Sequence, residues 1–149
     1  MNEKLKTVIL IVEDEGLIAL EMMEFLMQEG YRVLDPVPTG EEAVEQCMNY
    51  PRPDLILMDL ILAGAIDGIE AARRIRDRFP IPVIILTACD NGRTGERLKE
   101  LAPEGYLVKP STREELLAAI SLVVESHQRR NFTENGEESL RDMQGRTDQ

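Results

Sequence analysis

Several residue types that direct a protein toward a particular class are scarce or absent in this 149-residue sequence. Tryptophan is absent, histidine occurs once, and the two cysteines, Cys47 and Cys89, indicate neither a disulfide framework nor a metal site. No apolar run approaches the roughly 20 residues that a membrane span requires, and the first residues lack the layout of a signal peptide. We therefore expect a cytoplasmic protein that has no membrane partner.

Positive charge is also in short supply. The 17 lysine and arginine residues face 28 aspartate and glutamate residues, which gives a formal net charge of −11 at pH 7. A general nucleic-acid binder needs a basic stripe, so no direct nucleic-acid partner is expected. The apolar fraction of 43% and the charged fraction of 30% are ordinary for a globular protein. We expect one domain at residues 1–127 and a polar, disordered tail at residues 128–149.

Short apolar runs alternate with helical patterns along the chain. The runs predict strands at residues 8–12, 31–34, 55–59, 83–86 and 105–108. The patterns predict helices at residues 16–29, 41–48, 67–78, 96–101 and 112–127. Thr39, Asp67 and Thr112 are suitable amino-terminal caps, and Gly30 is a suitable carboxyl-terminal one. Five strands alternating with five helices predict a flavodoxin-like α/β fold, a doubly wound five-stranded parallel sheet in the order 2-1-3-4-5.

The predicted helix at residues 16–29 is apolar around most of its circumference, with its polar residues confined to a narrow arc. That apolar surface is wider than a helix needs to pack on one face of a sheet. Two interpretations stay open. The helix is either deep in the core, or its outer methionines form part of an adaptable partner surface.

Polar residues follow the predicted strands at the end where each strand finishes. Glu13 and Asp14 follow the first strand, Asp59 ends the third, Thr87 follows the fourth, and Lys109 follows the fifth. With the strand order 2-1-3-4-5, the switch point between the first and third strands places Glu13, Asp14 and Asp59 in one cleft. Three carboxylates repel one another, and a set of oxygen ligands of this kind suits Mg²⁺.

A metal ion, the Lys109 ammonium group and the Thr87 hydroxyl around one free carboxylate would bind the three oxygens of a phosphoryl group. Asp59 would then be the in-line nucleophile. Each of these residues, taken alone, is more simply explained as a solvated charge or as a cap. Their occurrence at successive strand ends of one fold favours a functional site.

With these motifs, the sequence resembles the receiver domain of the two-component response regulator family. The resemblance covers roughly residues 6–126 and rests on the stretches Val12–Glu15, Pro53–Asp59, Asp67–Glu70, Leu86–Ala88 and Gly105–Pro110. It implies a signalling domain rather than an enzyme, in which Asp59 accepts a phosphoryl group from the phosphohistidine of a histidine kinase or phosphotransfer protein. It further implies that Mg²⁺ is held by Asp59, by Asp14 directly, by Glu13 through water, and by the backbone carbonyl of Ile61.

The resemblance also assigns roles to the remaining site residues. Lys109 matches the motif lysine, and its peptide bond to Pro110 is typically cis in the family. Thr87 and Tyr106 match a switch pair, in which the hydroxyl turns toward the phosphoryl group and the ring follows inward. A downstream protein partner would bind the face formed by the fourth helix, fifth strand and fifth helix. A phosphorylation-dependent homodimer is one candidate assembly, and the methionine-rich first helix is a candidate docking site for the kinase.

The sequence departs from the family pattern in two places that bear on function. The loop at residues 60–67 is longer than the commonest family version and lacks its usual proline, so the resemblance does not predict its conformation. Ile61 and Cys89 lie two residues beyond Asp59 and Thr87, at positions that tune dephosphorylation in the family. Both side chains are poorly suited to orient an attacking water, so we expect slow autodephosphorylation.

Three alternatives share part of this pattern. A flavodoxin-type cofactor binder has the same architecture, but the acids at residues 13–15 would repel the phosphate of the flavin. A phosphatase of the haloacid dehalogenase type also uses an aspartate nucleophile with Mg²⁺, but Ile61 stands where its second aspartate is needed. The third alternative is a receiver fold that serves as a constitutive protein-interaction module and is never phosphorylated. The intact acidic cluster argues against it, because such a module does not need mutually repelling carboxylates.

Overall fold

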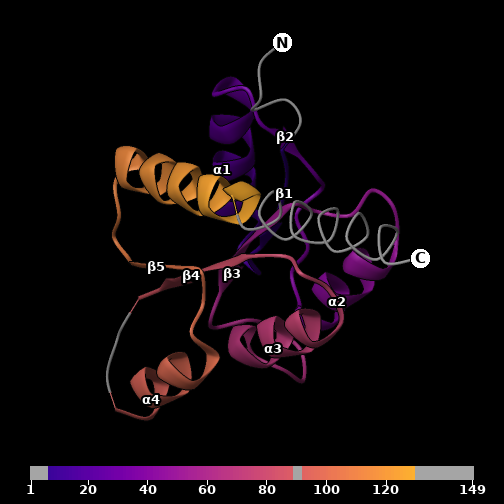
Figure 1. Cartoon of the computed structure of the whole chain (residues 1–149), viewed down its shortest axis with the longest axis vertical. Coiled ribbons are helices and arrows are strands. Elements are labelled where there is room, and N and C mark those ends of the chain that lie inside the picture. The colour runs from indigo at the N-terminus through magenta and orange to yellow at the C-terminus, as the bar shows by residue number, and fades with distance from the viewer. Residues whose placement is uncertain (1–6, 89–91, 130–149) are drawn as a thin grey trace, which may run out of the picture.

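The computed structural model, which describes residues 7–88 and 92–129, contains one parallel sheet in the order β2-β1-β3-β4-β5 (Figure 1). Its strands are β1 (Val8–Val12), β2 (Arg32–Val33), β3 (Leu55–Asp59), β4 (Val83–Thr87) and β5 (Gly105–Val108). Between them lie the helices α1 (Gly16–Gln28), α2 (Gly40–Met48), α3 (Gly68–Arg78) and α4 (Gly92–Leu101). A C-terminal helix covers residues 113–129. The predicted fold class and strand order are confirmed.

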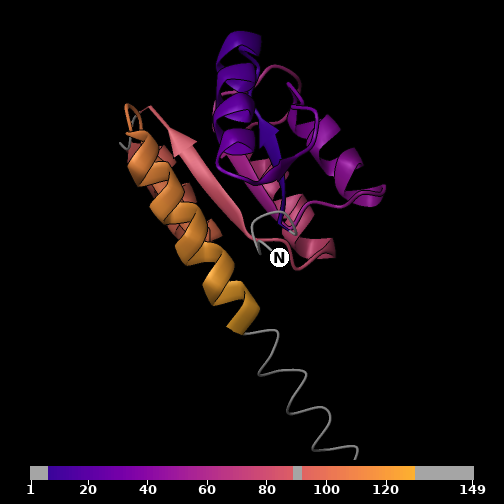
Figure 2. The ribbon, with the colours of Figure 1, turned by 90° about the horizontal axis from the view of Figure 1, so that it is seen from above.

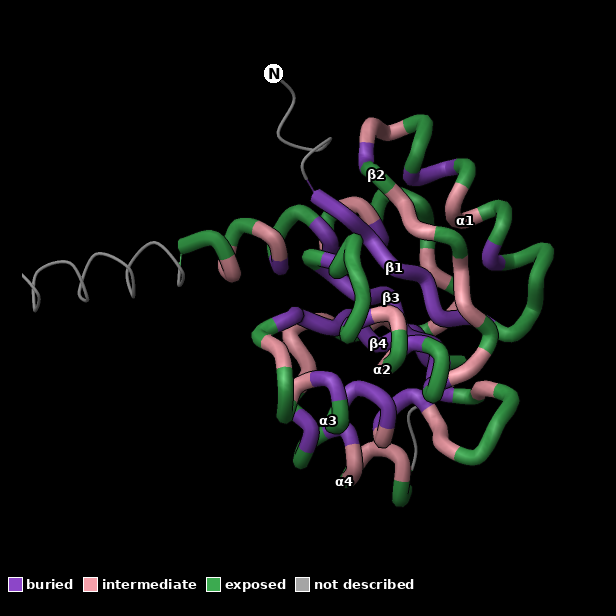
Figure 3. The backbone as a smooth tube through the Cα atoms, turned by 90° about the vertical axis from the view of Figure 1, so that its right-hand side faces the viewer, coloured by how far each residue is buried: buried purple, intermediate pink, exposed green. Residues whose placement is uncertain are grey.

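Helices cover both faces of the sheet, as the unbroken apolar runs of its central strands require. On one face, α1 and the C-terminal helix pack Leu26 and Ile120 against Ile9, Leu57 and Ile84 of the strands. On the other face, α2, α3 and α4 contribute a second core cluster, which contains Ala43, Cys47, Ile75, Leu98 and strand residues Leu10, Ile56 and Ile85. Figure 1 shows this division, and in the view from above the helices of the first face lie toward the reader (Figure 2). Every residue of β1, β3 and β4 is buried (Figure 3).

The structure answers the open question about the first helix. Its inner face is buried through Ala19, Phe25 and Leu26, whereas Leu20 and Met27 on the outer face are 58% and 54% exposed. The helix is therefore not deep in the core, and it carries an apolar outer surface.

Local sequence signals begin and end the helices as predicted. The Thr39 side chain accepts a hydrogen bond from the Glu42 amide at 3.1 Å, and Asp67 and Thr112 accept equivalent bonds at 2.9 and 3.0 Å. Each cap of this kind stabilises a helix by about 1 kcal/mol. At the carboxyl end of α1, Gly30 adopts a positive φ of 99°, a conformation that favours glycine.

Several predicted boundaries differ from the structure. Strand β2 covers Arg32–Val33 rather than residues 31–34, although the Leu34 amide still donates a hydrogen bond to the carbonyl of Ile9. The regular pairing with β1 does not continue beyond this bond, because Pro36 has no amide hydrogen to donate. Helix α4 begins at Gly92 rather than Glu96, since Gly92 and Gly95 weaken the helical pattern without preventing the helix. The C-terminal helix continues through residue 129, and the rest of the predicted tail lies outside the described residues. None of the described helices is long and apolar enough to cross a membrane.

Candidate functional site

The parallel pairing of β1 with β3 brings the predicted acids together. Val12 of β1 is in register with Met58 of β3, so Glu13 and Asp59 follow side by side at the carboxyl edge of the sheet. This edge lies at the topological switch point, where the order of the strands reverses and open α/β sheets bind ligands. The backbone of Glu13 is fixed there by a 3.0 Å hydrogen bond from its amide to the carbonyl of Val37.

The carboxylates of Glu13, Asp14 and Asp59 form one cluster, with an oxygen atom of each lying within 4.8 Å of the others. Within the described part of the chain, it is the one group of three or more such residues that could hold a metal ion. Glu13 and Asp59 are buried, with 4% and 9% of their surfaces exposed, whereas Asp14 is exposed. The cluster is therefore closed on the side of the sheet and open to solvent at Asp14.

Lys109 reaches into the cluster from the end of β5. Its Nζ atom lies 3.2 Å from Oδ2 of Asp59 and 3.5 Å from Oε2 of Glu13. The peptide bond that follows, to Pro110, is cis, as the resemblance implied. The Lys109 amide donates a 2.6 Å hydrogen bond to the carbonyl of Thr87, which ties the end of β5 to the end of β4. The ammonium group is thus held beside both buried carboxylates.

The charges of the cluster do not balance. Burial raises the pKa of Glu13 to about 7, and a hydrogen bond and charge repulsion from Asp59 act in the same direction. Burial would lower the pKa of Lys109, but the Asp59 and Glu13 carboxylates raise it, so the ammonium form is kept. With all three acids ionised, three negative charges and one positive charge leave −2. All ligand atoms are oxygen and one acid faces water, a set that fits Mg²⁺.

The loop at residues 60–67 begins at the cluster. The Ile61 amide donates to Oδ1 of Asp59 at 3.3 Å, while the Ile61 side chain is 75% exposed and points away from the core. Gly68 closes the loop against the same strand, because a Cβ atom there would lie 2.0 Å from the carbonyl oxygen of Asp59. Only glycine permits α3 to begin this close to the end of β3.

The predicted switch pair lies on one face of the sheet. Tyr106 of β5 is in register with Ile85 of β4, and Thr87 follows two residues later on the same face as Ile85. Thr87 is buried at the edge where the acids lie, and the Tyr106 side chain is partly exposed. Cys89, the second predicted dephosphorylation position, lies outside the described residues.

Two residues that the sequence did not single out hold the loop at residues 60–67. Oε1 of Glu41 in α2 accepts hydrogen bonds from two loop amides, and Arg97 of α4 forms a two-pronged ion pair with Asp67 at 2.5 and 3.0 Å. Burial would raise the pKa of Asp67, but the hydrogen bonds from Arg97 and from the Glu70 amide outweigh it and lower the pKa. No sequence pattern indicates these contacts, because the partners are 24 to 30 residues apart.

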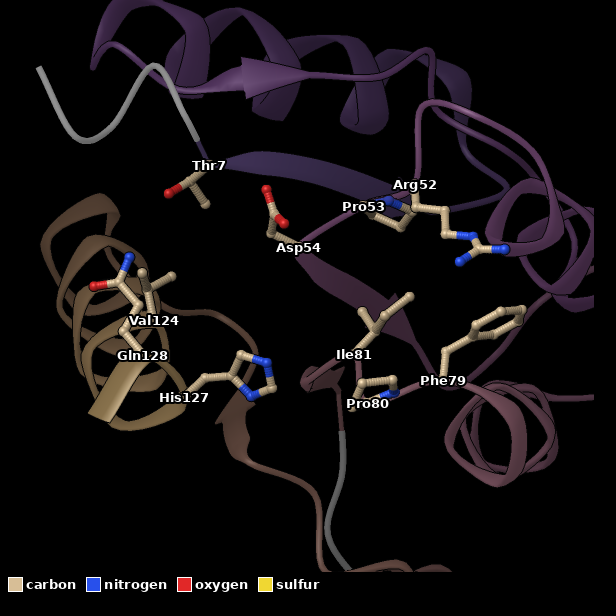
Figure 4. A pocket seen from close by; sticks show the side chains of 10 residues that line it. All are labelled: Thr7, Arg52, Pro53, Asp54, Phe79, Pro80, Ile81, Val124, His127 and Gln128. Carbon is tan, nitrogen blue, oxygen red and sulfur yellow. The ribbon is translucent and has the colours of Figure 1, made fainter. Parts of the chain in front are cut away.

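A separate pocket of about 390 Å³ lies at the amino-terminal ends of the strands, opposite the acidic cluster (Figure 4). It is lined by residues near the beginnings of β1, β3 and β4 and by the C-terminal helix, including Asp54, Phe79 and His127. Asp54 is already engaged there, since its Oδ2 accepts a 2.8 Å hydrogen bond from the Val8 amide. The pocket contains none of the clustered acids and is not part of the candidate site.

Comparison with known proteins gives one consistent result. Residues 9–121 match the family model described as the response regulator receiver domain. The transcriptional regulatory protein PdtaR of Mycobacterium tuberculosis is 38% identical over 116 residues, which are 78% of this chain and 56% of PdtaR. The transcriptional regulatory protein ResD of Bacillus subtilis is 36% identical over 140 residues, which are 91% of this chain and 55% of ResD. The chain thus spans just over half the length of these relatives.

Solved structures agree with the sequence matches. The signal receiver domain of a modulated diguanylate cyclase from Desulfovibrio desulfuricans has a TM-score of 0.76 at 36% identity, with coverage of 83% of this chain and 97% of that one. The BeF3-activated receiver domain of RstA from Klebsiella pneumoniae has a TM-score of 0.71 at 27% identity, with coverage of 79% and 98%.

Proposed function

The chain belongs to the response regulator receiver family, and from that premise we propose that it takes part in two-component signalling by accepting a phosphoryl group on Asp59. The observation that carries the proposal is the geometry around this one side chain. Asp59 is buried at the carboxyl edge of the sheet, 3.2 Å from the Lys109 ammonium and within 4.8 Å of two further carboxylates. Such an arrangement attracts a divalent cation and a phosphoryl group together.

In the proposed transfer, an oxygen of Asp59 attacks the phosphorus atom of a phosphohistidine. The phosphorus–nitrogen bond breaks, the histidine nitrogen leaves with the electron pair, and an acyl phosphate forms on Asp59. Asp14, Asp59 and the carbonyl of Ile61 would hold Mg²⁺ directly and Glu13 would hold it through water, and the ion would supply positive charge to the phosphoryl oxygens.

The side chains of the protein complete the site. Lys109 remains beside the reacting carboxylate and balances its charge, as its present contacts with Asp59 and Glu13 support. The Thr87 hydroxyl would donate a hydrogen bond to a phosphoryl oxygen. Because Tyr106 lies on the same face of the sheet, a shift at Thr87 would favour an inward position of the ring and bias an existing two-state equilibrium.

We propose two partner surfaces. The outer face of α1, with exposed Leu20 and Met27, suits a phosphodonor kinase or phosphotransfer protein, because apolar side chains there are free of the core. The face formed by α4, β5 and the C-terminal helix carries the partly exposed Tyr106 and Val108 and suits a downstream protein or a second copy of this chain. PdtaR and ResD are named as transcriptional regulatory proteins, and a regulatory role in transcription is a proposal for a longer protein containing this domain.

Incubation with acetyl phosphate, followed by intact-mass spectrometry, tests the proposed chemistry. The wild-type chain should gain one phosphoryl group in Mg²⁺ and none in EDTA, and Asp59→Asn should gain none in either. A wild-type chain that binds Mg²⁺ but gains no phosphoryl group would instead favour the constitutive interaction module. Beryllofluoride, the activating group named for RstA, gives a second probe, since it should bind only when Asp59 and Mg²⁺ are both present.

A further inference from the structure

The loop at residues 60–67 is poorly determined by its own sequence. It contains no proline, and Gly64 within it adopts a φ of +100°. Glycine without a neighbouring proline leaves many backbone conformations accessible, so contacts from outside the loop must select one of them. Residues 63–65 are exposed and contribute little packing. The contacts that fix this loop therefore lie elsewhere in the molecule.

Several of these contacts come from the start of α2. Oε1 of Glu41 accepts hydrogen bonds from the amides of Ala65 at 2.8 Å and Ile66 at 3.1 Å. Thr39 forms an isolated parallel bridge with Ala63, two residues earlier in the loop. These contacts fix the middle of the loop to the first turn of a rigid helix.

Gly64 shows how closely the carboxylate fits the loop. A Cβ atom at this position would lie 2.7 Å from Oε2 of Glu41, closer than nonbonded atoms approach. Hydrogen bonds from its own amide and from Ala65 and Ile66 lower the pKa of Glu41, so the group is ionised at neutral pH. A carboxylate that accepts bonds from two successive amides is a strong anchor, because charge-assisted hydrogen bonds are roughly twice as strong as neutral ones.

The other end of the same loop meets the acidic cluster. Leu60 is held by hydrogen bonds to Leu86 and from Gly68, and the Ile61 amide contacts Asp59. Ile61 is the residue whose carbonyl would complete the Mg²⁺ site, and its exposed side chain does nothing to hold it. Only three residues lie between Ile61 and the Glu41 anchor at Ala65, so the anchor limits where the Ile61 carbonyl can move.

We infer that Glu41 is a positioning residue for the metal site, which acts by holding the loop so that the Ile61 carbonyl faces the cation. The inference rests on the proposed function, because it assigns a supporting residue to the Mg²⁺ site of the receiver. Outer-sphere partners of metal ligands commonly change metal affinity by about 10-fold or more when they are removed.

Magnesium titrations followed by NMR amide shifts test the inference in a set of matched variants. Glu41→Gln keeps an acceptor oxygen for Ala65 and Ile66, whereas Glu41→Ala removes it, and both lose the same charge. We expect the Mg²⁺ dissociation constant to rise about 10-fold in Glu41→Ala and to rise by clearly less in Glu41→Gln, whose neutral oxygen still accepts the two hydrogen bonds at roughly half their strength. Glu45→Ala, an exposed position on the same helix, should leave the constant unchanged.

Gly64→Ala provides a second test that leaves Glu41 in place. Its added methyl group should displace the carboxylate and also strain a backbone whose φ is +100°, so Mg²⁺ binding should weaken at least as much as in Glu41→Ala. Urea denaturation without Mg²⁺ should show that both variants are folded. Equal dissociation constants in Glu41→Ala and Glu41→Gln, whether weakened or not, would overturn the inference. A wild-type chain that binds no Mg²⁺ would overturn the proposed function and this inference with it, whereas normal wild-type binding with unaffected variants would overturn this inference alone.

Discussion

Removal of one charge from the acidic cluster should stabilise the metal-free fold and abolish its response to Mg²⁺. Asp14 is the suitable position for this change, because its side chain is exposed and Asp14→Asn leaves the buried packing intact. Asp14 lies within 4.8 Å of both Glu13 and Asp59. At pH 8, above the raised pKa of about 7 for Glu13, the Glu13 carboxylate is ionised in the folded protein.

The magnitude follows from these separations. Two unit charges 4.8 Å apart repel by about 0.9 kcal/mol in water, so two such pairs contribute about 1.7 kcal/mol. Attraction between Asp14 and the Lys109 ammonium offsets part of this repulsion. We expect Asp14→Asn to raise the free energy of unfolding by about 1 kcal/mol in EDTA. In Mg²⁺ at ten times its dissociation constant, the wild type should gain about 1.4 kcal/mol, whereas the variant should gain little.

Urea denaturation at pH 8, in EDTA and in MgCl₂, measures both quantities. The order of stability should reverse between the two conditions, and added NaCl should reduce the advantage of the variant in EDTA because salt screens exposed charges. Glu45→Gln, which changes the net charge equally at an exposed site on α2, should show neither effect. An Asp14→Asn protein that is less stable than wild type in EDTA, or that keeps the full Mg²⁺ response, would refute this electrostatic explanation.

Four further outcomes are expected. Ala102→Gly should stabilise the fold by about 0.5–1 kcal/mol in thermal denaturation, because Ala102 has a φ of 49° that disfavours a Cβ atom. Arg97→Ala should lower the free energy of unfolding by about 1 kcal/mol at pH 7, because it removes the partly exposed ion pair between Arg97 and Asp67. Because the folded pKa of Asp67 is lowered, the pair contributes fully above the ordinary value of 3.8, and the difference between wild type and Arg97→Ala should shrink as pH falls through the folded pKa. Met27→Glu should slow phosphotransfer from the kinase without slowing the reaction with acetyl phosphate. A variant that reacts with the kinase as fast as the wild type does would exclude docking on α1. The phosphorylated chain should keep its phosphoryl group for minutes or longer in Mg²⁺, because Ile61 cannot orient water, and a lifetime of seconds would contradict this.

The central strands and the acidic cluster were predictable because local signals specify them. An apolar run that is buried on both faces, such as the one that ends at Asp59, can only be a central strand of a covered sheet. Once the strand order is known, the carboxyl edge follows, and Glu13 must lie beside Asp59. The helix caps were predictable for the same reason, since Thr39 and Asp67 each bond to an amide three residues away.

Contacts between distant segments were not predictable. In the sequence, Glu41 has the features of an ordinary acid in the first turn of a helix, where the helix dipole favours negative charge. Nothing in the sequence connects it to a loop residue 24 positions away. In the sequence, Arg97 resembles a solvated charge, and only the fold shows that α4 brings it to Asp67, the cap of α3. Edge strand β2 was overpredicted by one residue at each end, because a strand with one neighbour has few contacts to extend it beyond Arg32 and Val33. The roles assigned to the individual site residues stay predictions.

The identity of the phosphorylated residue tests the central claim most directly. Reduction of the acetyl phosphate-treated chain with borohydride converts an aspartyl phosphate to homoserine, and tandem mass spectrometry of the peptides then locates the change. We predict homoserine at Asp59 alone, in amounts that require Mg²⁺. Homoserine at Asp14, or a stable phosphoryl group on His127 with Asp59 unmodified, would contradict the proposal that the buried carboxylate beside Lys109 is the acceptor.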